Sequence, residues 1–302
     1  MPSAPRSRRE IREALRALGA RPSRRRGQNF LVDGRVLERV VAAAGPRAGD
    51  LVLEVGSGLG GLTERLGAAG AEVVAVEIDP ALAGFLRGLF AGTPRVRVVE
   101  ADALDGRGGL SGELRAALAA APHRGRLLCV ANLPYSIATP LLLALLRLEP
   151  PPSHLVLMVQ KEVAERIRAA PSTPAYGPLS VLVQSVARAS TICVVPAVAF
   201  HPVPEVASAV LKIVPDGGLR NAIADRGRLT ELIHAAFGMR RKTLGNALAR
   251  AGRADAAALR AAGVDPARRA ETLSPGEFVA LAAALPSLAS GAAGAETRRT
   301  SP

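Results

Sequence analysis

Residues 51–61 read Leu-Val-Leu-Glu-Val-Gly-Ser-Gly-Leu-Gly-Gly. The first five are aliphatic apart from one glutamate, which is typical of a strand that is covered on both faces of its sheet. Four glycines then fall within six positions, so the backbone can turn sharply and approach a ligand without a Cβ in the way. A helical composition resumes over 63–69. The order of strand, glycine turn and helix predicts the first unit of a nucleotide-binding α/β fold.

The glycine turn alone leaves the identity of the ligand open. Gly56, Gly58 and Gly61 satisfy the spacing Gly-x-Gly-x-x-Gly of NAD and FAD sites, and S-adenosylmethionine sites use a similar turn. Glu77 lies at the end of the next predicted strand, 72–79, where an acidic side chain accepts hydrogen bonds from ribose hydroxyls. All three ligands contain such a ribose, so the choice among them depends on other residues.

Two further predicted strands, 96–102 and 126–132, also end in polar residues, and another apolar strand is predicted over 154–160. Helical segments separate these strands, and this alternation predicts a parallel sheet of the Rossmann-like α/β class. The carboxyl ends of parallel strands face the ligand in such sheets, so we expect the residues at these ends beside one site. These residues are Gly56, Glu77, Asp102 and Asn132.

The charge of the chain indicates a polyanionic partner. The 302 residues include 39 Lys and Arg against 26 Asp and Glu, a formal net charge of +13. Nearly all the cations are arginine, which codon bias can explain, but codon bias does not explain the surplus of cations over acids. Nucleic acid is the usual partner for such a surplus, and an anionic membrane surface is the weaker alternative.

The remaining composition bears on compartment and metal content. Cys129 and Cys193 each lie in an apolar run, which favours a reducing cytoplasm over a disulfide framework or a zinc site. The four histidines show no metal-ligand spacing, so we expect no metal. Apolar runs such as 140–146 fall far short of the ~18 residues that a membrane span needs. We therefore expect a cytoplasmic protein without a membrane span.

The basic N-terminal segment, residues 1–26, holds nine arginines against two glutamates. Ile11, Leu15 and Leu18 recur at helical spacing, which predicts a short amphipathic helix with a basic face. No apolar stretch follows the charges, which excludes a secretory signal peptide. Import into an organelle remains the minor alternative.

Four regions are expected along the chain: the N-terminal segment 1–26, a Rossmann-like α/β domain at 27–215, a helical C-terminal domain at 216–286 and a disordered tail at 287–302. Asp33 is expected to cap a helix over 33–44. The prolines at 202 and 204 stiffen a loop that starts at Phe200. In the C-terminal region, Ser274-Pro-Gly-Glu277 forms a capping box before the last of four predicted helices.

Asn132-Leu-Pro-Tyr135, at the end of a predicted strand, favours chemistry on an exocyclic base amine. Such a nitrogen is a poor nucleophile because its lone pair is delocalised into the ring. Two acceptors on its N–H groups, the Asn132 side-chain oxygen and a backbone carbonyl, would localise that lone pair. Pro134 favours extended backbone before it, and Tyr135 offers a face for base stacking, worth about 1–3 kcal/mol per base. A nicotinamide dehydrogenase has no use for these residues.

Four motifs in register resemble those of the rRNA adenine N6-dimethyltransferases. They are Gly27-Gln-Asn-Phe-Leu31, Glu54-Val-Gly-x-Gly58, Asn132-Leu-Pro-Tyr135 and Phe200-x-Pro-x-Pro-x-Val-x-Ser208. The motifs at 161–167, 175–180 and 240–244 resemble the bacterial branch that modifies small-subunit rRNA. The resemblance covers residues 8 to about 285. Ser57 departs from it, because the family commonly has proline there, and we expect this small residue to leave the ligand unchanged.

The resemblance implies S-adenosyl-L-methionine as cofactor and assigns roles to matching positions. Cofactor contacts are implied for Asn29, Leu31, Gly56, Glu77, Asp102 and Asn132. The target base would meet Asn132, Pro134 and Tyr135, with Phe200 stacking opposite Tyr135. The basic N-terminal segment and the cluster of Arg240, Arg241 and Lys242 are expected to bind RNA phosphates, with a merely solvated helix face as the alternative for both.

The implied reaction is dimethylation of two adjacent loop adenosines near the 3′ end of small-subunit rRNA. We expect a monomer that acts on a partly assembled ribosomal subunit. Two alternatives stay open: a related enzyme of the antibiotic-resistance type that modifies large-subunit rRNA, and a non-catalytic RNA-binding or ribosome-assembly factor on the same fold.

Overall fold

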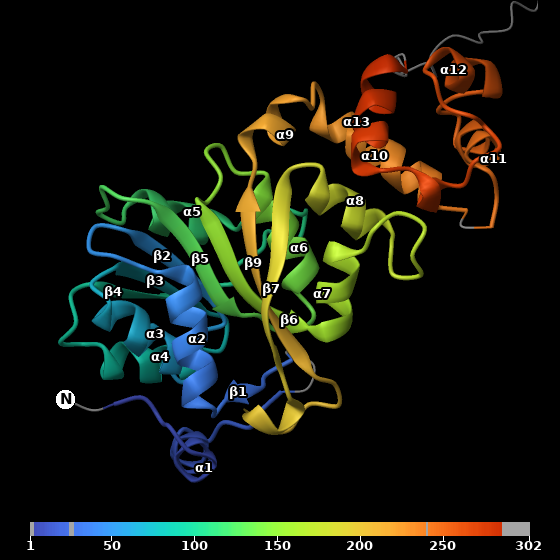
Figure 1. Cartoon of the computed structure of the whole chain (residues 1–302). Coiled ribbons are helices and arrows are strands. Elements are labelled where there is room, and N and C mark those ends of the chain that lie inside the picture. Colours follow the sequence, from blue (N-terminus) through green and yellow to red (C-terminus); the bar gives the residue numbers. More distant parts are fainter. Residues whose placement is uncertain (1–2, 24–26, 240, 286–302) are drawn as a thin grey trace, which may run out of the picture. The chain divides into compact units, whose positions relative to one another are not determined.

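The computed structural model describes residues 3–23, 27–239 and 241–285 (Figure 1). The chain divides into two compact units: Met1–Ala169 with Val186–Arg220, and Ala170–Ser185 with Asn221–Pro302. The second unit thus takes in a segment from the middle of the chain. The domain boundaries expected from the sequence stay a prediction, and the expected tail at 287–302 lies outside the described residues.

The first unit contains a seven-stranded sheet with the order β4-β3-β2-β5-β6-β9-β7. Its strands are β2 (Leu51–Val55), β3 (Glu72–Glu77), β4 (Val96–Glu100), β5 (Leu127–Asn132), β6 (His154–Gln160), β7 (Ala187–Val195) and β9 (Ser208–Pro215). The first five in spatial order are parallel, whereas β9 pairs antiparallel with both β6 and β7. The chain runs from β2 out to β4 and returns to the other side of β2 at β5, which creates a topological switch point there. The predicted Rossmann-like α/β class is confirmed.

The helices of the first unit connect these strands (Figure 1). They are α1 (Arg8–Ala17), α2 (Gly34–Ala44), α3 (Gly61–Ala68), α4 (Pro80–Leu89), α5 (Gly112–Ala119), α6 (Ala138–Leu146) and α7 (Lys161–Arg168), and α9 (Gly217–Asn221) follows β9 at the boundary between the units. The predicted cap of α2 is confirmed, because the Asp33 carboxylate accepts a hydrogen bond of 2.9 Å from the Arg35 N–H. Asp79 caps α4 in the same way, at 3.0 Å from the Ala81 N–H.

The core of the first unit explains why the sheet forms from these segments. Every residue of β2 is buried, as its uninterrupted apolar composition predicts for a central parallel strand. Valines at alternate positions of neighbouring strands, such as Val52, Val73 and Val130, pack into one cluster with α2 and α3. The cluster packs α2 and α3 against the sheet, and α3 begins at the last residue of the glycine turn.

A second, two-stranded sheet pairs β1 (Phe30–Leu31) with β8 (Phe200–His201), antiparallel and in the register Leu31↔Phe200. The sequence predicts a stiffened loop at Phe200 and no strand at Phe30. Two-residue strands are too short to show a periodicity, so no sequence pattern marks them. Their pairing brings Phe30 and Leu31 beside Phe200.

The second unit is helical in its described part, which confirms the predicted helical region. Its helices are α8 (Pro178–Gln184), α10 (Arg226–Phe237), α11 (Leu244–Arg250), α12 (Ala256–Ala261), the 3₁₀ turn Ala270–Thr272 and α13 (Pro275–Ala284). Three aromatic rings form its centre: Tyr176 and Phe237 have ring centroids 6.3 Å apart, and Phe237 stacks on Phe278 at 5.8 Å.

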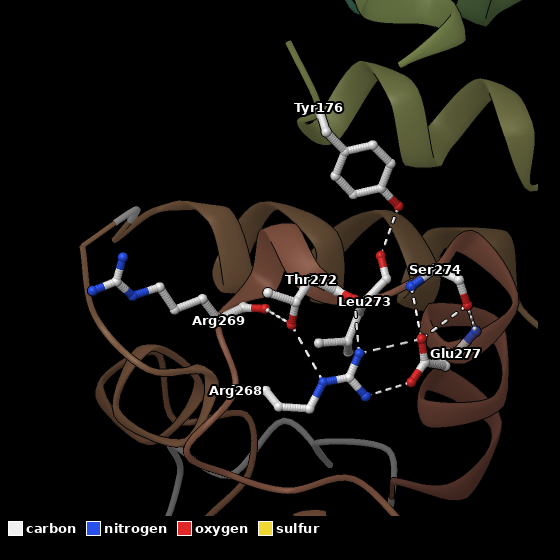
Figure 2. Close-up of polar contacts among 7 residues, drawn as sticks. All are labelled: Tyr176, Arg268, Arg269, Thr272, Leu273, Ser274 and Glu277. Atoms are coloured by element: carbon white, nitrogen blue, oxygen red, sulfur yellow. Dashed lines mark hydrogen bonds and ion pairs between the residues drawn. The ribbon is translucent and has the colours of Figure 1, made fainter. Parts of the chain in front are cut away.

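A polar network closes this aromatic centre (Figure 2). The Tyr176 hydroxyl donates to the Leu273 carbonyl at 2.7 Å, and Arg268 forms an ion pair with Glu277. The predicted capping box of α13 is confirmed, because the Ser274 hydroxyl accepts from the Glu277 N–H at 3.2 Å while the Glu277 carboxylate accepts from the Ser274 N–H at 2.8 Å. Tyr176 is therefore a packing residue of this unit.

Candidate functional site

A cavity of about 720 Å³ opens at the carboxyl ends of the parallel strands in the first unit. Its walls come from the glycine turn after β2, from the ends of β3, β4 and β5, and from the N-terminal segment. Every residue that the sequence assigns to cofactor binding or catalysis lines this one cavity. These residues are Asn29, Leu31, Gly56, Glu77, Asp102, Asn132, Pro134, Tyr135 and Phe200.

The glycine turn requires glycine at Gly56 and Gly58, for conformation and for space. Their φ angles are +77° and +57°, values that residues with a Cβ rarely adopt. A Cβ on Gly56 would lie 3.1 Å from the Pro134 ring, and one on Gly58 would lie 3.2 Å from the Phe30 ring. The turn is thus packed against the Asn-Leu-Pro-Tyr segment on one side and against Phe30 of β1 on the other.

Glu77 is tied to this turn by backbone hydrogen bonds. One carboxylate oxygen accepts from the Gly58 N–H at 2.8 Å and the other from the Asp79 N–H at 3.0 Å. Burial, which leaves Glu77 only 4% exposed, raises its pKa, and these two hydrogen bonds lower it. A carboxylate has about four lone-pair sites, so each oxygen can accept a further hydrogen bond from a ligand.

Glu54 forms a second carboxyl group directly behind the turn, within one of the sequence motifs but without a predicted role. It is 2% exposed, and the Thr63 hydroxyl donates to it at 2.5 Å. Burial raises the pKa of Glu54 to about 8, while the hydroxyls of Thr63 and Ser57 lower it and the nearby charge of Glu77 raises it. The Ser57 hydroxyl lies close enough to Glu54 to favour the ionised form of that carboxyl group, yet the buried Ser57 Oγ has no hydrogen bond of good geometry.

Asn132 ends β5, and its amide orientation is set by the backbone of Asn29. Its Nδ2 donates to the Asn29 carbonyl at 3.1 Å, and a carbonyl can only accept, so the nitrogen end of the amide faces Asn29. A Cβ on Gly27 would lie 3.0 Å from the Tyr135 backbone nitrogen. Residues 27–29 therefore lie against the Asn-Leu-Pro-Tyr segment, at both Asn132 and Tyr135.

Tyr135 and Phe200 occupy different surroundings within the cavity. The Tyr135 hydroxyl and the Ser208 hydroxyl are 3.2 Å apart, which ties the ring to the first residue of β9. Phe200 is 1% exposed and belongs to the main core cluster, with Leu31 opposite it in the β1–β8 pair.

Asp102 lies exposed and accepts a hydrogen bond of 2.9 Å from the Leu104 N–H.

The predicted RNA-binding cluster lies apart from the cavity in sequence and belongs to the second unit. Arg241 and Lys242 are exposed in the segment between α10 and α11. Arg240 lies outside the described residues. Their contact with RNA stays a prediction.

The described part of the chain shows neither a metal-binding group nor a membrane-crossing helix. Within 3–23, 27–239 and 241–285, no three His, Cys, Asp or Glu side chains come together to hold a metal ion. In the same ranges no helix combines the length and the apolar composition that a membrane crossing needs.

Comparison with curated proteins gives high identity over most of the chain. The chain is 48% identical over 263 residues to the ribosomal RNA small subunit methyltransferase A of Anaeromyxobacter sp. (strain K), covering 84% of this chain and 90% of that protein. The protein of the same name from Geobacter metallireducens is 43% identical over 281 residues, covering 91% of this chain and 99% of that protein.

Two solved structures match over similar lengths. A dimethyladenosine transferase from Plasmodium falciparum superimposes with a TM-score of 0.68 at 24% identity, covering 83% of this chain and 95% of that one. The 23S rRNA methyltransferase ErmE superimposes with a TM-score of 0.58 at 27% identity, covering 85% and 99%.

The family comparison agrees with the resemblance found in the sequence motifs. The model of the family described as ribosomal RNA adenine dimethylase matches residues 20–286, which include the glycine turn, Asn132-Leu-Pro-Tyr135 and the helices of the second unit. The predicted resemblance is confirmed, and the nicotinamide dehydrogenase alternative is wrong. The chain belongs to the ribosomal RNA adenine dimethylase family, whose members are rRNA adenine dimethyltransferases.

Proposed function

We propose that the protein uses S-adenosyl-L-methionine to dimethylate N6 of two adjacent adenosines near the 3′ end of small-subunit rRNA. The observation that carries the proposal is the convergence of Glu77 and Asn132-Leu-Pro-Tyr135 on one cavity beside the glycine turn. The relatives named ribosomal RNA small subunit methyltransferase A support the small subunit as the source of the RNA.

The residues of the cavity fit such a cofactor. A volume of about 720 Å³ lies within the usual range for small-molecule sites, about 300–1,000 Å³. Glu77 has lone pairs left for ribose hydroxyls, and the exposed Asp102 carboxylate can accept from an adenine amine. Gly56 keeps the turn free of side chains where the methionine portion would lie, with Asn29 and Leu31 on the facing segment. When bound, the cofactor supplies an activated methyl group on a sulfonium.

The target amine is positioned by Asn132 and by the backbone that follows it. Because Nδ2 of Asn132 faces the Asn29 carbonyl, Oδ1 is the end of the amide that can accept from the amine N–H. A backbone carbonyl beside Pro134 accepts the second N–H, so the lone pair is localised. Tyr135 stacks on the base. Catalysis is then mainly orientation and electrostatic support for the charge that develops on N6, and the methylated nitrogen can lose its proton to water.

The role of Phe200 requires a movement. A ring that is 1% exposed cannot offer a face to a nucleobase, so stacking opposite Tyr135 needs the β1–β8 pair to shift and expose it. An unstacked adenosine in a loop RNA reaches such a pocket more readily than one in a duplex.

The substrate choice rests on features outside the catalytic pocket. ErmE, a 23S rRNA methyltransferase, superimposes over 85% of this chain, so the fold alone does not choose between the two ribosomal subunits. We favour the small subunit because the relatives above carry that name and because the second unit, with exposed Arg241 and Lys242, adds a basic surface. The motif at 175–180 resembles the small-subunit branch, but its Tyr176 is buried in the second unit and so is not available to contact RNA. We infer a cytoplasmic monomer that acts on a partly assembled subunit.

The test offers unmodified small ribosomal subunits and naked large-subunit rRNA separately, each with cofactor labelled in the methyl group. Dimethyladenosine in the small-subunit rRNA, identified by mass spectrometry, is the expected result. Label only in the large-subunit RNA would overturn the substrate assignment. RNA binding without any label would favour the non-catalytic assembly factor.

A further inference from the structure

Helix α1 closes one side of the cofactor cavity with its apolar face. Ile11 and Leu15 are 2% and 5% exposed and form a cluster with Leu59 of the glycine turn and Leu82 of α4. Ile11 itself lines the cavity. The helix is therefore part of the wall that would enclose a bound cofactor.

The polar contacts that tie α1 to the rest of the unit come from its N-terminal end. Ser7 and Glu10 form a capping box, and Arg6 makes an exposed ion pair of 3.4 Å with Glu64 on α3. The Arg8 guanidinium donates to the Val198 carbonyl, directly before β8. A helix of ten residues is marginal by itself in water, so its folding depends on docking against this cluster. A ligand that binds the docked helix would therefore stabilise its docked position.

The opposite face of α1 is a row of cations. Arg9, Arg12 and Arg16 are exposed and follow at spacings of three and four residues, which places them on one face of a helix. Among the described residues, Arg9 alone in this row has a carboxylate partner, Glu13 at 2.8 Å. The positive charge of the helix also reaches His201 in β8. Burial is the main cause that lowers the pKa of His201, and the nearby charges of Arg12 and Arg8 lower it further. A row of this kind suits the regularly spaced phosphates of a nucleic-acid strand.

From these two faces we infer that α1 couples the binding of RNA to the retention of the cofactor. Phosphates of the substrate RNA bind to Arg9, Arg12 and Arg16 and hold the helix docked, and the docked Ile11 and Leu15 keep the cofactor cavity closed. This inference rests on the proposed function. Linkage makes the effect reciprocal, so a bound cofactor strengthens RNA binding by the same factor.

The experiment uses the full chain and the demethylated product S-adenosylhomocysteine as the cavity probe. Its affinity is measured by calorimetry with and without saturating unmodified small subunits. We expect RNA to raise the affinity about 5- to 50-fold, within the usual range of coupling between sites. In the variant R9Q/R12Q/R16Q the increase should fall below about twofold, and the salt-dependence slope of RNA binding should drop by ~0.7 for each phosphate that the variant no longer neutralises.

The matched control, R47Q/R115Q/R124Q, removes the same charge from exposed arginines that do not line the cavity. It should keep the coupling. Ile11→Ala should instead weaken probe binding even without RNA. Equal coupling in R9Q/R12Q/R16Q and the wild type would overturn the inference. So would a variant that binds anionic vesicles more weakly than the wild type but binds RNA equally well. If the wild type methylates small-subunit rRNA but shows no coupling, this inference alone fails; if nothing is methylated, the proposed function fails.

Discussion

The Gly58 N–H donates a hydrogen bond of 2.8 Å to the Glu77 carboxylate, and this bond joins the glycine turn to the end of β3. Because the second oxygen accepts from Asp79, the carboxylate orients two backbone segments that line the cavity. Glu77 therefore has a structural role in shaping the turn in addition to the proposed contact with ribose hydroxyls.

Replacing this carboxylate should weaken cofactor binding through both roles. Hydrogen bonds to charged groups are worth about 1.5–3 kcal/mol, so Glu77→Ala should reduce affinity for S-adenosylmethionine and for S-adenosylhomocysteine by about 10- to 100-fold. RNA affinity in the absence of cofactor should remain near the wild-type value. Titration calorimetry with each ligand provides the measurement. An unchanged cofactor affinity would refute the assignment.

Asn132 should matter for turnover more than for folding. Asn132→Ala removes the acceptor for the target amine, and loss of a positioning group should cut methyl transfer by ~100-fold or more. It also removes one hydrogen bond to Asn29, so the thermal midpoint should fall only slightly. Single-turnover methyl transfer and a melting curve on the same sample separate the two effects. Turnover close to that of the wild type would contradict the role.

Ser208 should act on catalysis through Tyr135. The two hydroxyls are 3.2 Å apart, and a hydrogen bond of this kind contributes about 0.5–1.5 kcal/mol net. Ser208→Ala and Tyr135→Phe should each lower methyl transfer a few-fold, and the double variant should be no slower than the slower single one. A double-mutant cycle on kcat measures this coupling. Fully additive losses would show that the hydroxyl pair does not orient the ring.

The sequence was sufficient for the parts of the site that follow from strand periodicity. Glycines after an apolar strand and polar residues at three further strand ends predict one ligand site, and Gly56, Glu77, Asp102 and Asn132 do line one cavity. The motif resemblance added Asn29, Leu31, Pro134, Tyr135 and Phe200, which line the same cavity. The capping box at Ser274 could also be predicted from the sequence, because capping depends on residues close in the chain.

Tertiary contacts account for what the sequence did not reveal. The β1–β8 pair joins two segments about 170 residues apart through two residues each, so its register and the burial of Phe200 leave no local pattern. The high pKa of Glu54 likewise depends on burial behind the turn, and a glutamate within an apolar strand is the only sequence signal of it. Tyr176 belongs to the motif at 175–180, which resembles the small-subunit branch, but its side chain packs in the helical core of the second unit.

The ion pair between Arg268 and Glu277 should make the second unit sensitive to acid (Figure 2). The Arg268 guanidinium and the Ser274 N–H lower the pKa of Glu277 to about 2, below its ordinary value of 4.5. A depressed carboxyl pKa stabilises the folded state above the unfolded pKa, and this contribution is lost as the pH falls from about 4.5 to 2. In Arg268→Met, the thermal midpoint should change less with pH between about 4.5 and 2 than it does in the wild type. The control Arg253→Met, which removes the arginine of the exposed pair with Glu231, should retain the wild-type dependence on pH.

Glu54 should produce the opposite dependence at higher pH. Burial raises the pKa of Glu54 to about 8 in the folded state, whereas the unfolded chain has the ordinary value of 4.5. Between these values the folded state binds the extra proton, so this contribution to stability is complete below pH 4.5 and is lost as the pH rises to about 8. Glu54→Gln keeps the shape of the side chain and carries no titrating proton. Its thermal midpoint should therefore fall less than that of the wild type between pH 5 and 8.5.

The comparison of variant with wild type isolates Glu54 from other groups that titrate in the same window. Burial lowers the pKa of His154, so its contribution to stability rises with pH up to about 6.5 and partly masks the effect of Glu54 in the wild type alone. That contribution is common to both proteins and cancels in the difference between their midpoints. The difference should grow in favour of Glu54→Gln as the pH approaches 8.5. If it stays constant from pH 5 to 8.5, Glu54 does not take up a proton on folding, and the Thr63 hydroxyl stabilises a carboxylate that is already ionised.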